Sequence, residues 1–247
     1  MSETVAKVAI ITGASRGIGA ATSERLARDG FNIVINYSSS DPTEAEAVAE
    51  RVRATGAGVL LCRGDVANPN TAKQIFDLAE TVFGGVDVLV NNAGVYELVK
   101  IAEMSDETFE RMVSVNLKGP FLFMREAVNR LRPGGRIINV SSSAIGLKPE
   151  RYGIYVATKA ALEAMTQVLS KEMRGRKISV NAVAPGQTAT RLFLDKQSDA
   201  EIERMAKMNP YERLGTPEDT AATIAFLCSP EGEWINGQVI RINGGTV

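Results

Sequence analysis

Residues 12–19 have the sequence TGASRGIG and connect a short apolar run, Val8–Thr12, to a helical run, Ala20–Asp29. At a strand–turn–helix junction, backbone N–H groups bind anions, and glycine lets the chain approach a pyrophosphate closely. The stretch therefore predicts a dinucleotide site. Its G-x-x-x-G-x-G spacing differs from the general G-x-G-x-x-G fingerprint, and glycines also serve tight helix–strand packing.

Short apolar runs rich in β-branched residues alternate with longer amphipathic stretches along the whole chain. Their continuous hydrophobicity is typical of strands buried on both faces. Because parallel strands need crossover connections, the alternation predicts one α/β domain, residues 1–247, with a doubly wound parallel sheet and helices on both faces. The expected strands are Val8–Thr12, Asn32–Tyr37, Val59–Arg63, Val86–Asn91, Arg136–Ser141, Ile178–Ala184 and Val239–Ile242.

Capping residues mark where several helices are expected to begin. Each of three pairs places a capping side chain before a proline at the first helical position: Asp41-Pro42, Asn68-Pro69 and Thr216-Pro217. Two long helices are expected at Ser105–Arg130 and Tyr152–Met173.

The composition excludes several classes of protein. With 28 Lys+Arg against 29 Asp+Glu, the chain offers no broad basic surface for a nucleic acid or an anionic membrane. It has no histidine, which excludes Ser-His-Asp hydrolases, His-ligated zinc enzymes and histidine proton shuttles. Cys62 and Cys228 lie in apolar runs, so we expect reduced thiols and no metal site. No apolar run approaches a membrane span and the N-terminus lacks a signal-peptide plan, so a cytoplasmic location is expected.

The end of the second expected strand bears on the choice between NAD and NADP. An NAD site usually places an acidic residue there to hold the ribose 2′-hydroxyl. This chain has Asn36 instead, followed by Tyr37 and Ser38–Ser40. Arg16 in the glycine turn could face a 2′-phosphate. We therefore expect NADP in preference to NAD, the alternative being that Ser38–Ser40 form only a solvated loop.

These motifs and others resemble the short-chain dehydrogenase/reductase family over essentially the whole chain. In that family's order stand TGASRGIG at 12–19, Gly64-Asp65-Val66, NNAG at 91–94, Asn116, Ser142, Tyr155-x-x-x-Lys159 and Pro185-Gly186. The resemblance implies a Rossmann-type sheet of order 3-2-1-4-5-6-7. It also implies NADP(H)-dependent hydride transfer between nicotinamide and a carbonyl or secondary alcohol. The general pattern is closest to 3-oxoacyl-acyl-carrier-protein reductases.

The resemblance further implies which residues border the cofactor. Asp65 would accept a hydrogen bond from the adenine amino group, unless it only caps the following helix. Asn91 would tie backbone together across the sheet, whereas Asn92 and Gly94 would border the cofactor. The full expected set is Gly13, Ser15, Arg16, Gly17, Ile18, Gly19, Asn36, Tyr37, Ser38, Asp65, Val66, Asn92, Ala93, Gly94, Val115, Tyr155, Lys159, Pro185, Gly186 and Thr188.

Tyr155 and Lys159 are expected to carry proton transfer. Four residues apart in a helix, they share one face with Cβ atoms about 6 Å apart. Lowering a phenol pKa from near 10 by about three units requires about 4 kcal/mol. The Lys159 ammonium, together with the positive nicotinamide ring, could supply much of this, so that Tyr155 protonates the developing alkoxide.

Two further residues complete the catalytic set that the resemblance implies. Ser142 follows the fifth expected strand and would orient the substrate oxygen, with Ser141 and Ser143 as alternatives. Asn116 would perturb its helix and hold a water that links Lys159 to solvent. The alternative is that Asn116 is a tolerated polar residue in a helix.

The substrate is open at this point. Residues 186–210 are expected to form a lid, in which Leu192–Leu194 provide an apolar inner surface or an ordinary packing face. Reduction of a 3-oxoacyl thioester linked to an acyl carrier would suit Arg130, Arg132 and Arg176 as contacts for an acidic partner. The alternatives are a broad aldehyde, ketone or quinone reductase, a sugar or polyol dehydrogenase, and a non-catalytic NADP-binding regulator. The resemblance also implies a homotetramer.

Overall fold

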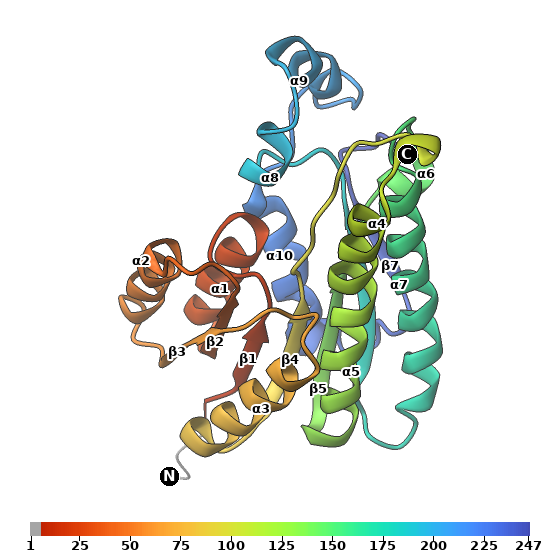
Figure 1. Ribbon diagram of the computed structural model, residues 1–247. Coiled ribbons are helices and arrows are strands. Elements are labelled where there is room, and N and C mark those ends of the chain that lie inside the picture. Colours follow the sequence, from red (N-terminus) through yellow and green to blue (C-terminus); the bar gives the residue numbers. More distant parts are fainter. Residues whose placement is uncertain (1–5) are drawn as a thin grey trace.

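The apolar runs form the seven strands of one parallel sheet in the computed structural model, which describes residues 6–247 (Figure 1). The order is β3-β2-β1-β4-β5-β6-β7, so the predicted doubly wound fold is confirmed. Residues 1–5 of the predicted domain lie outside the described residues. The strands are β1 (Val8–Ile11), β2 (Asn32–Tyr37), β3 (Val59–Arg63), β4 (Val86–Asn91), β5 (Leu131–Val140), β6 (Ser179–Pro185) and β7 (Val239–Ile242).

Helices cover both faces of this sheet (Figure 1). In β1, Ile10 packs into the core beneath α3, α5 and α7, and Ile11 into the core beneath α1, α2 and α10. This division follows from the alternation of side chains along a strand. Within residues 6–247, no helix is both long and apolar enough to cross a membrane. The α-helices are α1 (Gly17–Arg28), α2 (Thr43–Arg53), α3 (Pro69–Phe83), α4 (Asp106–Val113), α5 (Gly119–Arg130), α6 (Ala144–Leu147), α7 (Gly153–Glu172), α8 (Arg191–Leu194), α9 (Asp199–Ala206) and α10 (Pro217–Cys228).

Three of the predicted helix starts are found as capped N-termini. Asn68 and Ser105 accept hydrogen bonds from backbone N–H groups of the first turns of α3 and α4, and Thr216 forms a capping box with Asp219 on α10. The prediction for α2 is wrong by one residue. Pro42 is the N-cap there, and Asp41 accepts a hydrogen bond from the N–H of Thr43.

One predicted strand start differs from the structure, and one long predicted helix is divided at the position where Asn116 is expected to perturb it. β5 begins at Leu131 rather than Arg136, because Leu131 pairs with Val86 and a register shift accommodates the turn-like Pro-Gly-Gly segment within the strand. The single helix expected over residues 105–130 is interrupted. A π-helical turn, Ser114–Lys118, separates α4 from α5.

Both cysteines are buried free thiols, as predicted. Burial raises the pKa of the Cys62 thiol to about 11 and that of the Cys228 thiol to about 12. Both therefore remain protonated near neutral pH and serve as small core side chains.

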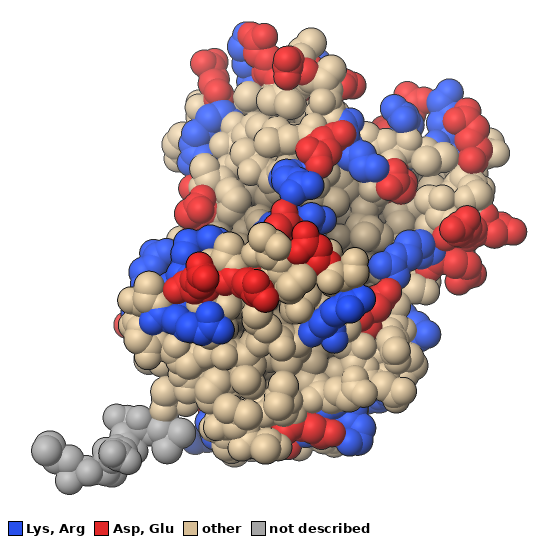
Figure 2. Space-filling view, turned by 60° about the vertical axis from the view of Figure 1, so that its left-hand side comes forward, with Lys and Arg blue, Asp and Glu red and all other residues tan. Residues whose placement is uncertain are grey.

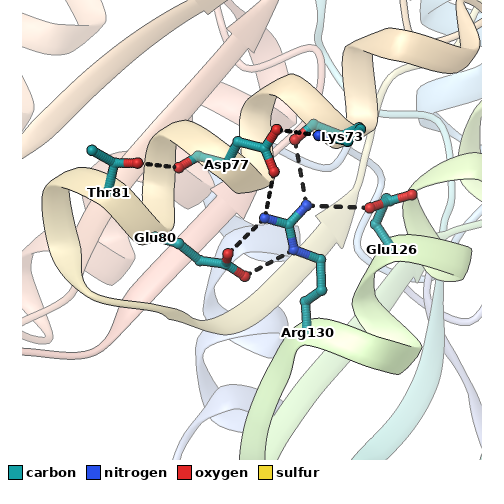
Figure 3. A network of polar contacts seen from close by, with 6 residues as sticks. All are labelled: Lys73, Asp77, Glu80, Thr81, Glu126 and Arg130. Carbon is teal, nitrogen blue, oxygen red and sulfur yellow. Dashed lines mark hydrogen bonds and ion pairs between the residues drawn. The ribbon is translucent and has the colours of Figure 1, made fainter.

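Arg130 at the end of α5 fastens this helix to α3 (Figure 3). Its guanidinium donates hydrogen bonds to Asp77 and Glu80 of α3 and to Glu126 one turn earlier in α5, at 2.6–3.2 Å. The same group lies 5.3 Å from the ring centroid of Phe76. Because only 17% of the Arg130 side chain is exposed, these contacts are less screened than ordinary surface ion pairs.

Replacing Arg130 should therefore destabilise the contact between α3 and α5. Arg130→Met leaves three carboxylates without their shared partner, and we expect the free energy of unfolding in urea to fall by about 2 kcal/mol. Arg125→Met on the exposed face of α5 is the matched control and should change it by less than about 1 kcal/mol. Equal effects of the two variants would contradict the role given to the network.

Candidate active site

A cavity of about 500 Å³ lies along the carboxyl ends of the strands, within the size range of small-molecule sites. Of the predicted cofactor residues, only Gly19 does not line it. Ser142, Tyr155 and Lys159 line the same cavity, whereas Asn116 does not. The fold thus brings together nearly all the residues that the sequence motifs single out.

The glycine turn after β1 has the shape that close approach to a phosphate requires. Gly13 and Gly17 adopt positive φ angles of 61° and 55°. A Cβ atom on Gly13 would lie 2.8 Å from the Cα of Ala93, so a side chain does not fit there. The N-cap of α1, Arg16, makes no side-chain capping bond, which leaves N–H groups of the first turn available to an anion. The turn therefore fits the pyrophosphate of a dinucleotide.

Gly19 serves packing, the alternative that the sequence left open for these glycines. A Cβ atom on Gly19 would lie 2.6 Å from Nδ2 of Asn92 and 2.7 Å from the carbonyl oxygen of Gly13. Nδ2 of Asn92 donates hydrogen bonds to the carbonyl oxygens of Thr12 and Gly13. Gly19 makes room for the Asn92 amide, which holds the turn against the end of β4.

Asn36 lines the cavity, but its side-chain amide is fully engaged. It accepts a hydrogen bond from the N–H of Gly13 and donates to the carbonyl oxygens of Cys62 and Gly64. The amide thus joins the ends of β2 and β3 to the glycine turn. The residues after Asn36 that line the cavity, and so can meet a ribose, are Tyr37, Ser38 and Ser39.

Two cavity residues near this end were not predicted from the sequence. Glu44, in the first turn of α2, pairs with Arg16 at 3.3 Å. Arg191, which begins α8, pairs with the same carboxylate at 2.6 Å. Their positions in the sequence could have indicated this, because Glu44 lies shortly after the β2 end and Arg191 shortly after Pro185-Gly186, two segments expected to border the cofactor. Their contact across 147 residues has no signature in the sequence.

Asp65 lies at the cavity wall after β3. Its carboxylate accepts hydrogen bonds from the N–H of Ala67 and from Arg111, at 2.9 and 2.7 Å. Partial burial opposes its ionisation, but these two donors outweigh burial and hold the pKa of Asp65 below its usual value. Asn68, not Asp65, caps α3.

The NNAG segment, residues 91–94, contacts the sheet through its first residue and lines the cavity with the others. Asn91 donates a hydrogen bond to the Asn139 side chain on the neighbouring strand β5, at 2.9 Å, and does not line the cavity. Gly94 lines the cavity, and a Cβ atom there would lie 3.6 Å from Nζ of Lys159. The segment thus connects the glycine-turn side of the cavity with Lys159.

Three consecutive serines follow β5, and their contacts distinguish them. Ser141 donates to the Glu163 carboxylate at 2.7 Å, and Ser143 donates to the carbonyl oxygen of Ala184 at 2.7 Å. The Ser142 hydroxyl accepts a hydrogen bond from the N–H of Ala144 at 3.2 Å and faces Tyr155, where it acts to lower the pKa of the phenol. The contacts of Ser141 and Ser143 within the chain favour Ser142 among the three, and its role stays a prediction.

Tyr155 and Lys159 project from one face of α7 into the cavity. Lys159 Nζ lies 5.8 Å from the Tyr155 ring centroid and donates a 2.7 Å hydrogen bond to the carbonyl oxygen of Val140. Burial lowers the pKa of Lys159 to about 8. Burial also raises the pKa of Tyr155, against the effect of its Ser142 hydrogen bond. Desolvation outweighs the effect of Ser142 in the chain alone, and the lowering of the phenol pKa by Lys159 together with the positive nicotinamide ring stays a prediction.

Asn116 sits in the π-helical turn between α4 and α5, fully buried beside the cavity wall. Its amide donates to the carbonyl oxygen of Val95 at 2.7 Å and accepts from the N–H of Val95 at 2.9 Å. The interruption of the helix is as predicted. Asn116 holds the chain directly after Gly94, and the water relay stays a prediction.

Because the pKa of Lys159 is lowered by burial, the free energy of unfolding should depend on pH. That pKa is about 8 in the folded chain against an ordinary 10.5, so the unfolded chain binds more protons between these values and stability rises with pH there. From pH 7 to pH 10, the cofactor-free wild type should gain about 2 to 3 kcal/mol relative to Lys159→Met in urea unfolding. Lys171→Met, on the exposed surface at the end of α7, should run parallel to the wild type. Parallel curves for wild type and Lys159→Met would disprove the assignment.

Comparison with known proteins agrees with this geometry over nearly the whole chain. The family model described as enoyl-(acyl carrier protein) reductase matches residues 13–247. A short-chain type dehydrogenase/reductase of Picea abies is 48% identical, over 98% of this chain and 92% of that protein. A chloroplastic NADPH-dependent aldehyde reductase 2 of Arabidopsis thaliana is 44% identical, over 97% and 93%.

A solved structure extends the likeness to three dimensions. The short-chain dehydrogenase of Burkholderia cenocepacia in complex with NADP superposes with a TM-score of 0.92 at 34% identity, over 97% of each chain. The sheet order, the glycine turn and the Ser142, Tyr155 and Lys159 cluster are thus accompanied by close similarity in sequence and fold. The chain belongs to the short-chain dehydrogenase/reductase family of oxidoreductases.

Proposed function

We propose that the protein reduces the carbonyl group of aldehydes and ketones that carry an apolar or aromatic body, with NADPH preferred over NADH. The observation that carries the proposal is the placement of Tyr155, which lines the cavity together with Ser142 and Lys159, within an aromatic wall of that cavity. When bound, the reduced cofactor supplies the hydride; the chain supplies the proton and the orientation.

The proton is donated by Tyr155 to the oxygen that develops negative charge. Because burial keeps the phenol protonated near neutral pH, Tyr155 is in the acid form that reduction needs. Ser142 donates a hydrogen bond to the same oxygen and aligns it with the phenol. Lys159, with a pKa of about 8, is largely charged at pH 7 and stabilises the phenolate that remains. Asn116 positions the segment that faces Lys159.

The substrate side of the cavity favours an aromatic or apolar body. The ring centroids of Tyr96 and Tyr152 lie 5.6 and 6.1 Å from that of Tyr155 and 6.0 Å from each other. Such rings stack against planar substrates. The expected lid segment, residues 186–210, contributes apolar side chains to the same cavity: Leu192, Phe193, Met205 and Met208. The name of the Arabidopsis relative, an aldehyde reductase, supports this substrate class.

Reduction of a 3-oxoacyl thioester is the second candidate, since the family model is described by an acyl-carrier-protein reductase. The arginines expected to meet an acidic carrier are occupied within the chain. Arg130 holds three carboxylates, Arg132 pairs with Asp87 at 3.0 Å, and Arg176 donates to the carbonyl oxygens of Val128 and Leu131. These contacts favour the free aldehyde or ketone.

Preference for NADPH is supported by the residues at the ribose end of the cavity. The β2 end carries no carboxylate, and Arg16 lines the cavity beside Ser38. The NADP complex of the Burkholderia neighbour agrees with this assignment. A single domain, a homotetramer and a cytoplasmic location remain predictions of the sequence; the Arabidopsis relative is described as chloroplastic.

A depletion assay tests the proposal directly. NADPH consumption is followed with an aryl aldehyde, an aliphatic diketone, a quinone, a sugar and an acetoacetyl thioester, and the assay is repeated with NADH. We expect the highest kcat/KM with the aryl aldehyde or quinone, and at least about a tenfold loss when NADH replaces NADPH. Preferred turnover of the thioester would favour the second candidate, and equal efficiency with both cofactors would refute the preference. A non-catalytic regulator would bind NADPH and consume none.

Removal of the Tyr155 hydroxyl tests the proton donor. Tyr155→Phe should lower kcat by about 10² to 10⁴, the usual contribution of a positioned acid, while NADPH still binds. Tyr211→Phe is the control, because Tyr211 is 74% exposed and lies outside the cavity. More than about a tenth of the wild-type kcat in Tyr155→Phe would exclude Tyr155 as the acid.

A further inference from the structure

One carboxylate spans the ribose end of the cavity and holds two arginines from distant parts of the chain. Glu44, on α2, accepts from Arg16 at 3.3 Å through one oxygen and from Arg191 at 2.6 Å through the other. All three residues line the cavity. Arg191 also has Asp195 one turn further along, at 3.7 Å. We refer to Arg16, Glu44 and Arg191 as the clasp.

The clasp links the glycine turn to the segment expected to form the lid. Arg16 belongs to the turn and Arg191 begins α8, directly after Thr190. The Cγ2 atom of Thr190 would lie only 3.2 Å from a Cβ on Gly17, so this segment passes directly over the start of α1. Arg191 therefore lies close to Arg16, and both guanidinium groups contact the Glu44 carboxylate.

The ion pairs of the clasp are weak enough to exchange. Their side chains are 55%, 42% and 64% exposed for Arg16, Glu44 and Arg191, and exposed pairs of this kind contribute little to stability. On the face drawn in Figure 2, acidic and basic side chains are intermixed, as expected where arginines are neutralised by neighbouring carboxylates. A phosphate monoester carries nearly two charges and binds arginine through two parallel hydrogen bonds. It should displace a single carboxylate from this pair of arginines.

We propose that Arg191 is a second ligand of the 2′-phosphate of NADP, beside Arg16, and that Glu44 occupies the phosphate position until the cofactor arrives. The inference rests on the NADP preference proposed above and extends it to a residue outside the glycine turn and the β2 end. Glu44 lines the cavity together with Tyr37, Ser38 and Ser39, which places the clasp at the ribose end. When the 2′-phosphate displaces Glu44, the Arg191 guanidinium exchanges its hydrogen bond with the carboxylate for hydrogen bonds with the phosphate.

This arrangement would let the substrate-side segment detect which cofactor is bound. Arg191 is followed immediately by Leu192 and Phe193, which line the cavity. Anchoring of Arg191 by a 2′-phosphate therefore orders the apolar residues next to it. NADH carries no phosphate at that position and leaves Arg191 paired with Glu44.

Binding measurements without a carbonyl substrate test the proposal. Dissociation constants for NADPH and NADH are measured by calorimetry for wild type, Arg191→Met and Glu44→Gln. Lys207→Met and Glu46→Gln are the matched controls: Lys207 pairs with Glu203 near the end of the lid segment, Glu46 shares the first turn of α2, and neither lines the cavity. We expect Arg191→Met to weaken NADPH binding about tenfold and to leave NADH within about twofold. Glu44→Gln should tighten NADPH binding about two- to fivefold, because a competing anion is removed.

Two results would overturn the assignment. Equal losses for NADPH and NADH in Arg191→Met would place Arg191 on the pyrophosphate, and a loss no larger than that of Lys207→Met would make the clasp a surface ion pair only. Hydrogen exchange provides a second readout. NADPH should slow amide exchange over residues 191–208 more than NADH does in wild type, and Arg191→Met should abolish this difference.

The outcome is separable from that of the proposed function. If wild type binds both cofactors equally while Arg191→Met weakens NADPH alone, the preference fails and the clasp stands. If wild type prefers NADPH and Arg191→Met changes nothing, the preference stands and the clasp fails.

Discussion

A parallel sheet covered on both faces has one edge, at the carboxyl ends of its strands, where side chains are released from both core packing and strand pairing. In this chain the two helical layers bury alternate side chains of every central strand and leave that edge open. Residues that directly follow different strands therefore meet there, among them Gly13, Asn92 and Ser142. The cavity forms here because all the parallel strands end on the same side of the sheet, and the motifs then determine which side chains line it.

Side-chain amides hold the loops of this edge in place. Asn36 connects the ends of β2 and β3 to the glycine turn, Asn92 connects the turn to β4, and Asn116 fixes the chain after Gly94. Asn36 and Asn116 are buried and bond the backbone through both amide atoms, so leaving them unpaired would be costly, whereas Asn92 is half-buried and bonds the backbone through Nδ2. These asparagines thus shape the site, while the hydroxyl, ammonium and guanidinium groups are left to meet ligands.

Most of the fold could be predicted from the sequence, because continuous β-branched runs and proline-marked caps are local signals. Strand β5 was placed too late because its first residues, Arg132-Pro133-Gly134-Gly135, have the composition of a turn and are accommodated by an irregular register. The meeting of Ser142, Tyr155 and Lys159 in one cavity could be predicted because their motif has fixed spacing. The pKa of Lys159 could not, since it depends on burial by elements distant in sequence. Glu44 and Arg191 were missed because their contact joins two exposed helix starts.

The π-helical turn at Ser114–Lys118 gives the region a second property. A π turn takes up one residue more than an α turn, so the side chains of α5 are rotated by about 100° from where a continuous helix would put them. The helix before the turn and the helix after it therefore have independent angular phases. Phe123 of α5 packs in the core beneath α3 and α7, while Asn116 in the π turn bonds the backbone of Val95, which lines the cavity. One extra residue thus allows a single helical rod to serve both the hydrophobic interior and the polar site.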